Sequence, residues 1–289
     1  MKTILRYAGG KTRAIKKITP FVEGYETIVS PFIGGGSLEV HWAANGHKVI
    51  GADIFDLLVN FWDQALNSPD RLVEELRKIS PTAEEYKRVK EDLMKTPQVQ
   101  AMLDGWKTDF YKREAKPLTA EQLAAYYYFN HNCSYGPGFL GWASKLYLED
   151  PKTPGQGNKK WNAMLKRIES FRCPNLTVKH QEDNKMFKGI YPMRNIPVHH
   201  NDFDHEKLRD LLHNHDGDFV LSYNNCETIR NYYSDFEFYY PEWFYSMGQG
   251  ETRIGKNRQA SDSYVKESHE ILIVKRSSSL KKVDTSVLY

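Results

Sequence analysis

The stretch Thr27-Ile28-Val29-Ser30-Pro31-Phe32-Ile33-Gly34-Gly35-Gly36-Ser37-Leu38-Glu39 decides the fold. Its β-branched run predicts a strand, and the glycine triplet before Ser37 predicts a tight turn followed by a helix. Residues without side chains let the backbone approach a ligand closely, and a helix start offers N–H groups to it. An ordinary glycine turn of an α/β protein has the same pattern, so this stretch alone leaves both interpretations open.

Two neighbouring segments favour the ligand-binding interpretation. Upstream lies Tyr7-Ala8-Gly9-Gly10-Lys11, and downstream the run from Lys48 to Asp53 predicts a second strand that ends in an acid. An acid about 20 residues past the glycines, at the end of the second strand, is placed to bind ribose hydroxyls. Helices expected at 11–18, 36–45 and 55–66 alternate with these strands, which indicates a parallel sheet with crossover helices.

These three elements together resemble the Dam-type (D12 class) family of DNA adenine-N6 methyltransferases. The resemblance implies an α/β fold, with an S-adenosylmethionine-dependent methyltransferase (Rossmann-like) sheet and a mostly helical target-recognition insert. It also implies S-adenosylmethionine as the cofactor. The positions that match the family's cofactor contacts are Tyr7, Ala8, Gly9, Gly10, Lys11, Pro31, Phe32, Gly34, Gly36, Asp53, Asp202 and Phe203.

Three of the acidic and basic residues near these motifs have simpler alternatives. Lys11 could be a solvated lysine in the first turn of a helix. Glu39 could orient the cofactor or act as an acid in the first helical turn. Asp202 could be a helix N-cap before Glu206 and Leu208, alone or in addition to a cofactor contact.

The expected catalytic motif departs from the family pattern. The family carries Asp, Asn or Ser, then Pro-Pro and an aromatic, after its fourth strand; the first side chain and a backbone carbonyl accept the amine hydrogens, and the aromatic stacks on the flipped base. Here the strand 218–221 is followed by Ser222-Tyr223-Asn224-Asn225. In one interpretation Ser222 and the Asn224 amide form a variant grip, with Tyr223 or another aromatic as the platform. In the other, the chain is a catalytically weak or inactive DNA-binding relative.

The stretch 68–195 is expected to contain helices and loops without strands. Helices are predicted at 70–79 and 83–94, and a third starts at 117–121 with Thr119 as its cap and runs through 123–130. A flexible basic loop is predicted at 154–160. Between Pro151 and Asn195 there are ten basic and three acidic residues, a local charge of +7 in a chain of net +3. A basic insert fits nucleic-acid contact, and a solvated basic face is the alternative. We therefore predict a methyltransferase domain at 1–67 and 196–289, with a DNA target-recognition insert at 68–195.

The remaining strands are expected at 195–198, 218–221, 236–240 and 270–274, and a loop at 247–258 precedes the last of them. Relatives carry an Arg-rich loop that ends in Asn at this place, lining the channel of the flipped base; a plain β-hairpin loop is the alternative. The residues expected to contact DNA are Asn132, Tyr135, Lys159, Lys160, Arg253, Lys256, Asn257 and Arg258.

Composition limits the other classes of function. Cys133, Cys173 and Cys226 are widely spaced, which predicts neither a metal site nor a disulfide set and indicates a reducing compartment. No apolar run has membrane-spanning length and no signal peptide is expected, so the protein is predicted to be cytoplasmic, in a bacterium or encoded by a virus. A dinucleotide oxidoreductase is disfavoured because Gly-x-Gly-x-x-Gly spacing is absent.

The sequence thus predicts a site-specific methyltransferase that modifies adenine N6 after base flipping. Its expected partner is double-stranded DNA. A cognate restriction endonuclease, as in restriction-modification systems, is left open.

Overall fold

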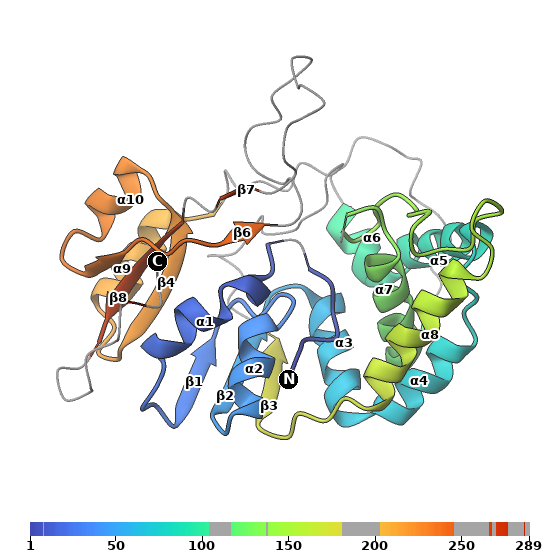
Figure 1. The fold of residues 1–289 in the computed structure, drawn as a ribbon, viewed down its shortest axis with the longest axis horizontal. Helices are drawn as coiled ribbons and strands as arrows, with labels where there is room; N and C mark the ends of the chain where they lie inside the picture. The colour runs from blue at the N-terminus through green and yellow to red at the C-terminus, as the bar shows by residue number, and fades with distance from the viewer. Residues whose placement is uncertain are drawn as a thin grey trace, which may run out of the picture.

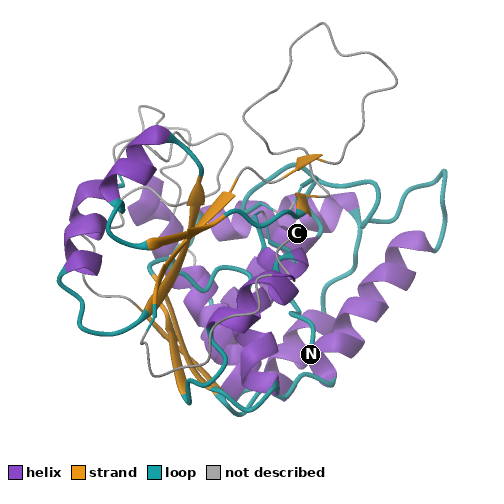
Figure 2. Cartoon of the chain, turned by 60° about the vertical axis from the view of Figure 1, so that its left-hand side comes forward, coloured by secondary structure: helices purple, strands orange, loops and turns teal. Residues whose placement is uncertain are grey.

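The computed structural model describes residues 1–7, 9–103, 117–136, 138–180, 203–245, 266–267, 270–276 and 286. Its strands form two three-stranded sheets and a short two-stranded ribbon. Figure 1 shows the first sheet in the middle of the molecule, the second sheet with α9 and α10 on one side, and a cluster of helices, α4 to α8, on the other. Seen from the side in Figure 2, the strands run between layers of helices. The predicted α/β class is therefore confirmed.

The first sheet is parallel and has the order β1-β2-β3. Its strands are β1 (Thr27–Ser30), β2 (Lys48–Asp53) and β3 (Leu176–His180). The connections run through α2 (Ser37–Ala44) and α3 (Asp56–Asn67), as the alternation of strands and helices predicted. Because parallel strands end at the same edge, the turn after β1 and the acid at the end of β2 lie together.

Strand β3 contradicts the expectation that the stretch 68–195 holds no strands. It pairs in parallel with β2, with Val49 opposite Leu176 and Asp53 opposite His180. Only five residues long and surrounded by polar sequence, it has too little apolar alternation to stand out. The division into 1–67, 68–195 and 196–289 stays a prediction, but the first sheet includes a strand from the expected insert.

The second sheet has the order β4-β8-β5, with β8 antiparallel to both neighbours. It consists of β4 (Phe219–Asn224), β8 (Glu270–Lys275) and β5 (Glu237–Tyr239), and the helices α9 (His205–His213) and α10 (Glu227–Tyr232) belong to the same part of the chain. The predicted strands at 218–221, 236–240 and 270–274 are confirmed, whereas 195–198 lies outside the described residues. A short ribbon joins β6 (Phe244–Tyr245) and β7 (Lys266–Glu267).

The helical cluster is built around α7 (Ala120–Asn132), whose residues Tyr127, Tyr128 and Phe129 are fully buried. A helix that is apolar on all sides must be surrounded by protein. Three helices pack on it directly: α3, α4 (Pro69–Arg77) and α5 (Ala83–Met94). The helix α8 (Gln156–Glu169) reaches it through Trp161, and α6 (Pro97–Leu103) contacts α5. Thr119 caps α7 in a capping box with Gln122, as predicted for the cap.

Two local expectations were wrong. The segment 154–160 is not a loop throughout, because α8 begins at Gln156 and buries Trp161, Leu165 and Ile168 on one face. The spacing of those apolar residues outweighs the glycines at its start. The helix expected at 11–18 is divided into a short 3-10 helix η1 (Lys11–Arg13) and α1 (Ile15–Ile18), followed by η2 (Thr19–Phe21).

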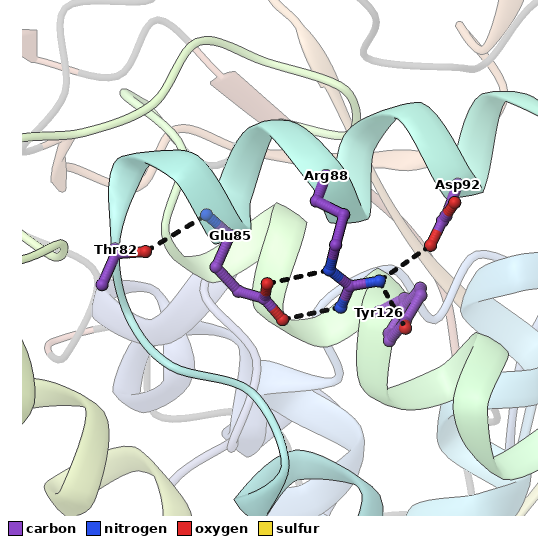
Figure 3. A network of polar contacts seen from close by, with 5 residues as sticks. All are labelled: Thr82, Glu85, Arg88, Asp92 and Tyr126. Atoms are coloured by element: carbon purple, nitrogen blue, oxygen red, sulfur yellow. Dashed lines mark hydrogen bonds and ion pairs between the residues drawn. The ribbon is translucent and has the colours of Figure 1, made fainter.

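A polar clamp fastens α5 to α7 (Figure 3). Arg88 binds both carboxylate oxygens of Glu85, at 2.8 and 2.6 Å, and also reaches Asp92 at 2.8 Å. The same guanidinium donates to the Tyr126 hydroxyl of α7 at 3.1 Å, while Thr82 caps the start of α5. The forked contacts with Glu85 and the contact with Asp92 lie within α5, and the hydrogen bond to Tyr126 connects this helix to α7.

Candidate functional site

The glycine turn between β1 and α2 is held in one conformation by contacts on both its N–H and C=O groups. The N–H of Gly34 donates to Oδ2 of Asp53 at 3.1 Å, and the Trp62 indole donates to the Gly34 carbonyl at 3.0 Å. Thr3 donates to the carbonyl of Gly35. Gly34 and Gly36 have positive φ angles of 46° and 62°, which side chains disfavour. The turn is therefore rigid.

The glycines are also needed because aromatic rings occupy the space that a Cβ would take. A Cβ on Gly34 would lie 3.0 Å from the Tyr7 ring, and one on Gly36 would lie 2.6 Å from Trp62. Tyr7 in turn stacks on His131 of α7, with 5.4 Å between ring centroids. Burial lowers the pKa of His131 to about 3, so this ring is neutral. Tyr7 thus lies between the turn and the helical cluster.

The Gly9-Gly10-Lys11 segment lies over the start of α2. The N–H of Gly10 donates to the Tyr7 carbonyl at 3.2 Å, and Gly9 has a φ of 73°. The hydroxyls of Thr12 and Ser37 are 2.9 Å apart, which ties this segment to the first residue of α2. A Cβ added to Gly9 would meet no atom within 4 Å, so the backbone here stays open to a ligand. The two glycine motifs of the sequence are therefore brought together.

A third part of the chain joins them through Glu270 at the start of β8. Lys11 Nζ donates to Oε1 of Glu270 at 2.7 Å and also to its Oε2, and the same carboxylate accepts a hydrogen bond from Ser222 Oγ. The Glu270 side chain is only 10% exposed. The Lys11 ammonium lies 5.5 Å from the Trp243 ring centroid, within cation–π distance. Sequence reasoning missed Glu270, because an acid at the start of an apolar strand has no distinguishing signal.

A cavity of about 800 Å³ opens among these elements. Its walls include β1 and β4, which are edge strands of their two sheets. Edge strands present backbone donors and acceptors, and the volume falls in the range of small-molecule sites, ~300–1,000 Å³. The expected site residues that line it are Tyr7, Gly9, Gly10, Lys11, Pro31, Phe32, Gly34, Gly36 and Ser222.

Asp53, at the end of β2, is hydrogen-bonded to the glycine turn. Its carboxylate accepts from Phe55 N–H as well as Gly34 N–H, each at 3.1 Å. Burial raises the pKa of Asp53, and the bonds from the Phe55 and Gly34 amides oppose that rise. In this structure the side chain fastens the turn to β2, and its expected contact with a ribose stays a prediction.

Glu39 is buried below the same turn, with 5% of its surface exposed, and it accepts a hydrogen bond from Ser30 Oγ at 2.6 Å. Burial raises the pKa of the Glu39 carboxyl to about 7, against the opposing effect of the Ser30 hydrogen bond. The acid therefore joins β1 to α2 inside the protein. It is far more enclosed than an ordinary first-turn acid on a helix surface.

The motif Ser222-Tyr223-Asn224-Asn225 divides between two surroundings. Consecutive residues of a strand point to opposite faces, and Ser222 lines the cavity whereas Tyr223 bonds to His205 of α9 and packs near Tyr233. Asn224 is exposed at the end of β4, and exposed Asn225 accepts from Arg230. Tyr223 is thus directed away from Ser222, which disfavours it as a stacking platform beside that serine.

Phe203 begins an aromatic series next to the site. Its ring lies 6.3 Å from Phe32, in the turn after β1, and 4.7 Å from His205. Asp204 caps α9 by accepting from Lys207 N–H at 2.8 Å, so the alternative of Asp202 as the cap of this helix was wrong.

The expected residues that lie outside the described part of the chain are Ala8, Asp202, Arg253, Lys256, Asn257 and Arg258.

The expected DNA-contacting residues that the structure describes differ in exposure. Asn132 is buried, and its amide accepts from Arg6 N–H at 2.9 Å and donates to the Tyr128 carbonyl at 3.0 Å, so it holds the N-terminal segment. Tyr135 is 72% exposed. Lys159 is exposed on α8, and Lys160 donates to the Leu146 carbonyl at 2.8 Å.

Trp142 is a surface residue that sequence reasoning did not select. It is 72% exposed, and its carbonyl accepts from Tyr135 N–H at 2.6 Å, so two exposed rings come from one short loop. The loop follows α7, and His131 at the C-terminal end of that helix stacks on Tyr7 beside the glycine turn.

Metal binding and membrane crossing are two features that the described ranges do not support. No group of three or more histidine, cysteine or acidic side chains there is arranged to hold a metal ion. Nor does any helix among those residues combine the length and apolarity that a bilayer crossing requires.

The fold and site define a mixed α/β protein with a cavity that runs along the edge strands β1 and β4 and is bordered by the glycine turn and the second glycine segment. A sequence profile of the D12 class N6 adenine-specific DNA methyltransferase family matches residues 7–176, more than half of the chain. The chain belongs to this family, and it is an enzyme of that kind. Among curated proteins, no sequence match was found.

Proposed function

We propose that the protein transfers a methyl group from S-adenosylmethionine to N6 of adenine in a short duplex sequence, after the base leaves the helix. The observation that carries the proposal is the meeting of Gly9-Gly10-Lys11, the glycine turn and Ser222 around one cavity. Members of the family are adenine-specific DNA methyltransferases, and enzymes of this family generally use S-adenosylmethionine. The proposal assigns both reactants to this cavity.

The residues present fit the cofactor. Gly9 has open space in front of its Cα, so an adenosyl or methionine group can approach the backbone closely. The start of α2 lies beside it, and N–H groups at a helix start favour a carboxylate. When bound, the cofactor supplies an electrophilic methyl carbon, and the protein's task is to position the reactants. Phe32, 39% exposed in the turn, is available to contact an aromatic ring.

Ser222 is assigned to the adenine amine. The lone pair of an exocyclic amine is conjugated into the ring, so the nitrogen is a poor nucleophile. Oxygen acceptors that hold its hydrogens favour a tetrahedral nitrogen whose lone pair points at the methyl carbon. Ser222 Oγ is such an acceptor and lies on the cavity wall.

On the DNA side, we assign the exposed rings of Tyr135 and Trp142 and the exposed Lys159 to the duplex. Cationic side chains neutralise phosphates without reading sequence, and aromatic rings can stack on an unpaired base. We further propose that most of the expected insert, with helices α4 to α8, carries target recognition, while β3 serves the catalytic sheet.

The test is transfer of labelled methyl from S-adenosylmethionine to mixed-sequence duplex DNA, followed by nucleoside analysis. The matched variant is Ser222→Ala, with Ser170→Ala at the end of α8 as the control, because Ser170 is exposed and does not line the cavity. We expect N6-methyladenine from the wild type and the control, and at least tenfold less from Ser222→Ala. Label on cytosine would refute the base assignment. Intact binding of cofactor and DNA without any transfer would support the inactive DNA-binding relative instead.

A further inference from the structure

Glu270 is an acid that no motif of the sequence singled out, yet it joins two parts of the site. Its carboxylate accepts from Lys11 Nζ of the N-terminal glycine segment and from Ser222 Oγ at the cavity wall. In the β4–β8 ladder Glu270 is paired with Asn224, two residues beyond Ser222. The side chain is 10% exposed, so these contacts are shielded from competing water.

A serine hydroxyl can donate one hydrogen bond and accept others, whereas an ionised carboxylate can only accept. Beside Glu270, the Ser222 proton is therefore directed to the carboxylate. The Ser222 lone pairs are then left for the cavity. A group that approaches Ser222 from the cavity meets a hydrogen-bond acceptor, which suits an amine and disfavours a carbonyl oxygen.

We propose that Glu270 is a positioning residue for methyl transfer, which orients the Ser222 hydroxyl as an acceptor for the target amine and takes up the proton released in the reaction. The proposal rests on the proposed function of the same site. It also explains how a serine can replace a carboxylate at the first position of the motif, since the negative charge is supplied from the neighbouring strand.

The proton balance of the step is complete. The lone pair of N6 forms the new N–C bond, and the electron pair of the broken C–S bond stays on sulfur. The product nitrogen then carries one proton too many. This proton passes to Ser222 Oγ while the Ser222 proton passes to the Glu270 carboxylate, and the resulting carboxylic acid returns its proton to water.

Lys11 fixes the carboxylate for this role. It binds both oxygens, at 2.7 Å for Oε1, and its own position is supported by the Trp243 ring. A carboxylate held from one side by an ammonium and from the other by a hydroxyl has little freedom to rotate. The N-terminal glycine segment thus contributes a cation that sets the geometry of the reacting group.

The decisive variant is Glu270→Gln, which keeps the size of the side chain and one acceptor oxygen but cannot accept a proton as a carboxylate does. The matched control is Glu237→Gln on β5, an exposed glutamate of the same sheet. Both proteins are compared with the wild type by thermal melting, by binding of S-adenosylmethionine and DNA, and by single-turnover methyl transfer at saturating concentrations. General acid–base groups contribute about 10²–10⁴-fold. We expect the Glu270→Gln rate to fall about 100-fold, with the affinities for S-adenosylmethionine and for the adenine duplex within threefold of the wild type.

A second readout separates orientation from folding. Duplexes with hypoxanthine at the target position carry a carbonyl oxygen where adenine carries its amine. The wild type should bind the adenine duplex more tightly than the hypoxanthine duplex. Glu270→Gln should lose most of this preference by binding the hypoxanthine duplex more tightly, because its amide can donate to Ser222 and release the hydroxyl proton toward the cavity. The double variant Ser222→Asp/Glu270→Gln, which restores one carboxylate, should recover transfer that Glu270→Gln lacks.

The outcomes are distinguishable. A Glu270→Gln rate within threefold of the wild type, or an unchanged preference for adenine over hypoxanthine, would overturn the assignment of Glu270 and leave the methyltransferase proposal intact. A wild-type protein that transfers no methyl group to adenine would overturn both. Loss of folding in Glu270→Gln alone, with full transfer in Ser222→Ala, would also overturn the assignment, because it makes Glu270 structural only.

Discussion

The backbone N–H of Gly34 donates a hydrogen bond to the side chain of Asp53 over 3.1 Å, and so the turn after β1 is fastened to the end of β2. The two residues are 19 positions apart in sequence. The second carboxylate oxygen of Asp53 accepts from Phe55 N–H, at the start of α3. One side chain therefore links two strand ends and a helix start at the edge of the sheet where the cavity opens.

Asp53→Asn should loosen this junction. An asparagine has one acceptor oxygen, so one of the two N–H groups at Asp53 would face an NH₂ group. We expect the free energy of unfolding to fall by about 1–2 kcal/mol and S-adenosylmethionine to bind about tenfold more weakly. Urea unfolding and calorimetric titration measure the two effects. Asp216→Asn, at an exposed position between α9 and β4, is the control and should change neither. Equal cofactor affinity in Asp53→Asn and wild type would contradict the prediction.

Gly35→Ala tests the close packing of the glycine turn on Tyr7. A Cβ on Gly35 would lie well inside van der Waals contact with the Cβ of Tyr7, so either the turn or the N-terminal segment must move. Overpacking of this kind costs about 1–3 kcal/mol. Gly46→Ala is the comparison, since its Cβ would meet no atom within 4 Å and only its φ of 99° adds strain. We expect urea unfolding to show a lower free energy of unfolding in both variants. Cofactor binding should fail in Gly35→Ala and should be retained in Gly46→Ala. Normal binding by Gly35→Ala would argue against the turn as part of the site.

The sequence predicted the parts of this site that depend on backbone conformation. The turn predicted at the glycine triplet lies between β1 and α2, and Asp53 ends the second strand as expected. It could not predict which side chains meet across long separations. Glu270 reaches Lys11 over 259 positions, and this partner depends on the pairing register of β8 with β4.

The sequence also did not reveal which polar residues are buried. Asn132 was expected to contact DNA, yet Asn130 and Asn132 are among the most buried polar residues of the described part of the chain. Asn130 accepts from Leu140 N–H at 2.7 Å, and so it supports the loop from inside. A polar residue inside a packed helix end is distinguished from a surface residue only by the neighbours that cover it.

Glu39 should make stability depend on pH in the neutral range. Its pKa is raised by burial to about 7 from 4.5, so between these values the native state binds more protons than the unfolded state. The contribution of the protonated Glu39 carboxyl to the free energy of unfolding is then complete below pH 4.5 and is lost as the pH rises through about 7. The shift corresponds to about 3 kcal/mol.

We therefore expect Glu39→Gln to remove this dependence. Between pH 4 and pH 8, the free energy of unfolding of the wild type should fall by up to about 3 kcal/mol relative to that of Glu39→Gln. Urea titrations at several pH values measure the difference. Glu84→Gln, at an exposed position in the first turn of α5, should leave the pH profile of the wild type unchanged. Parallel profiles for the wild type and Glu39→Gln would show that the carboxyl is solvated in solution.

Lys159 on α8 should bind DNA through charge alone. Each phosphate contact contributes about one unit to the slope of log affinity against log salt concentration. We expect Lys159→Gln to weaken binding similarly for all duplex sequences and to reduce the slope by about one. Lys48→Gln is the control, because Lys48 is exposed at the start of β2, the opposite strand end from the glycine turn. Fluorescence anisotropy between 50 and 200 mM salt, a range over which phosphate contacts change affinity strongly, gives both quantities. A slope identical to that of the wild type would remove Lys159 from the interface.

Trp142 should contribute to DNA binding through stacking and not through charge. Its ring is 72% exposed, and the hydrogen bond between its carbonyl and Tyr135 N–H belongs to the backbone, so truncating the side chain leaves the loop connected. Stacking on a base contributes about 1–3 kcal/mol and is independent of counterions. Trp142→Ala should therefore lower DNA affinity at every salt concentration with the slope unchanged, whereas Trp142→Phe should retain most of it. The effect should be larger on a duplex with a mismatch at the target base, because that base is already unpaired and available to stack. If Trp142→Ala alters only the salt slope, or affects matched and mismatched duplexes alike, the ring does not stack on the displaced base.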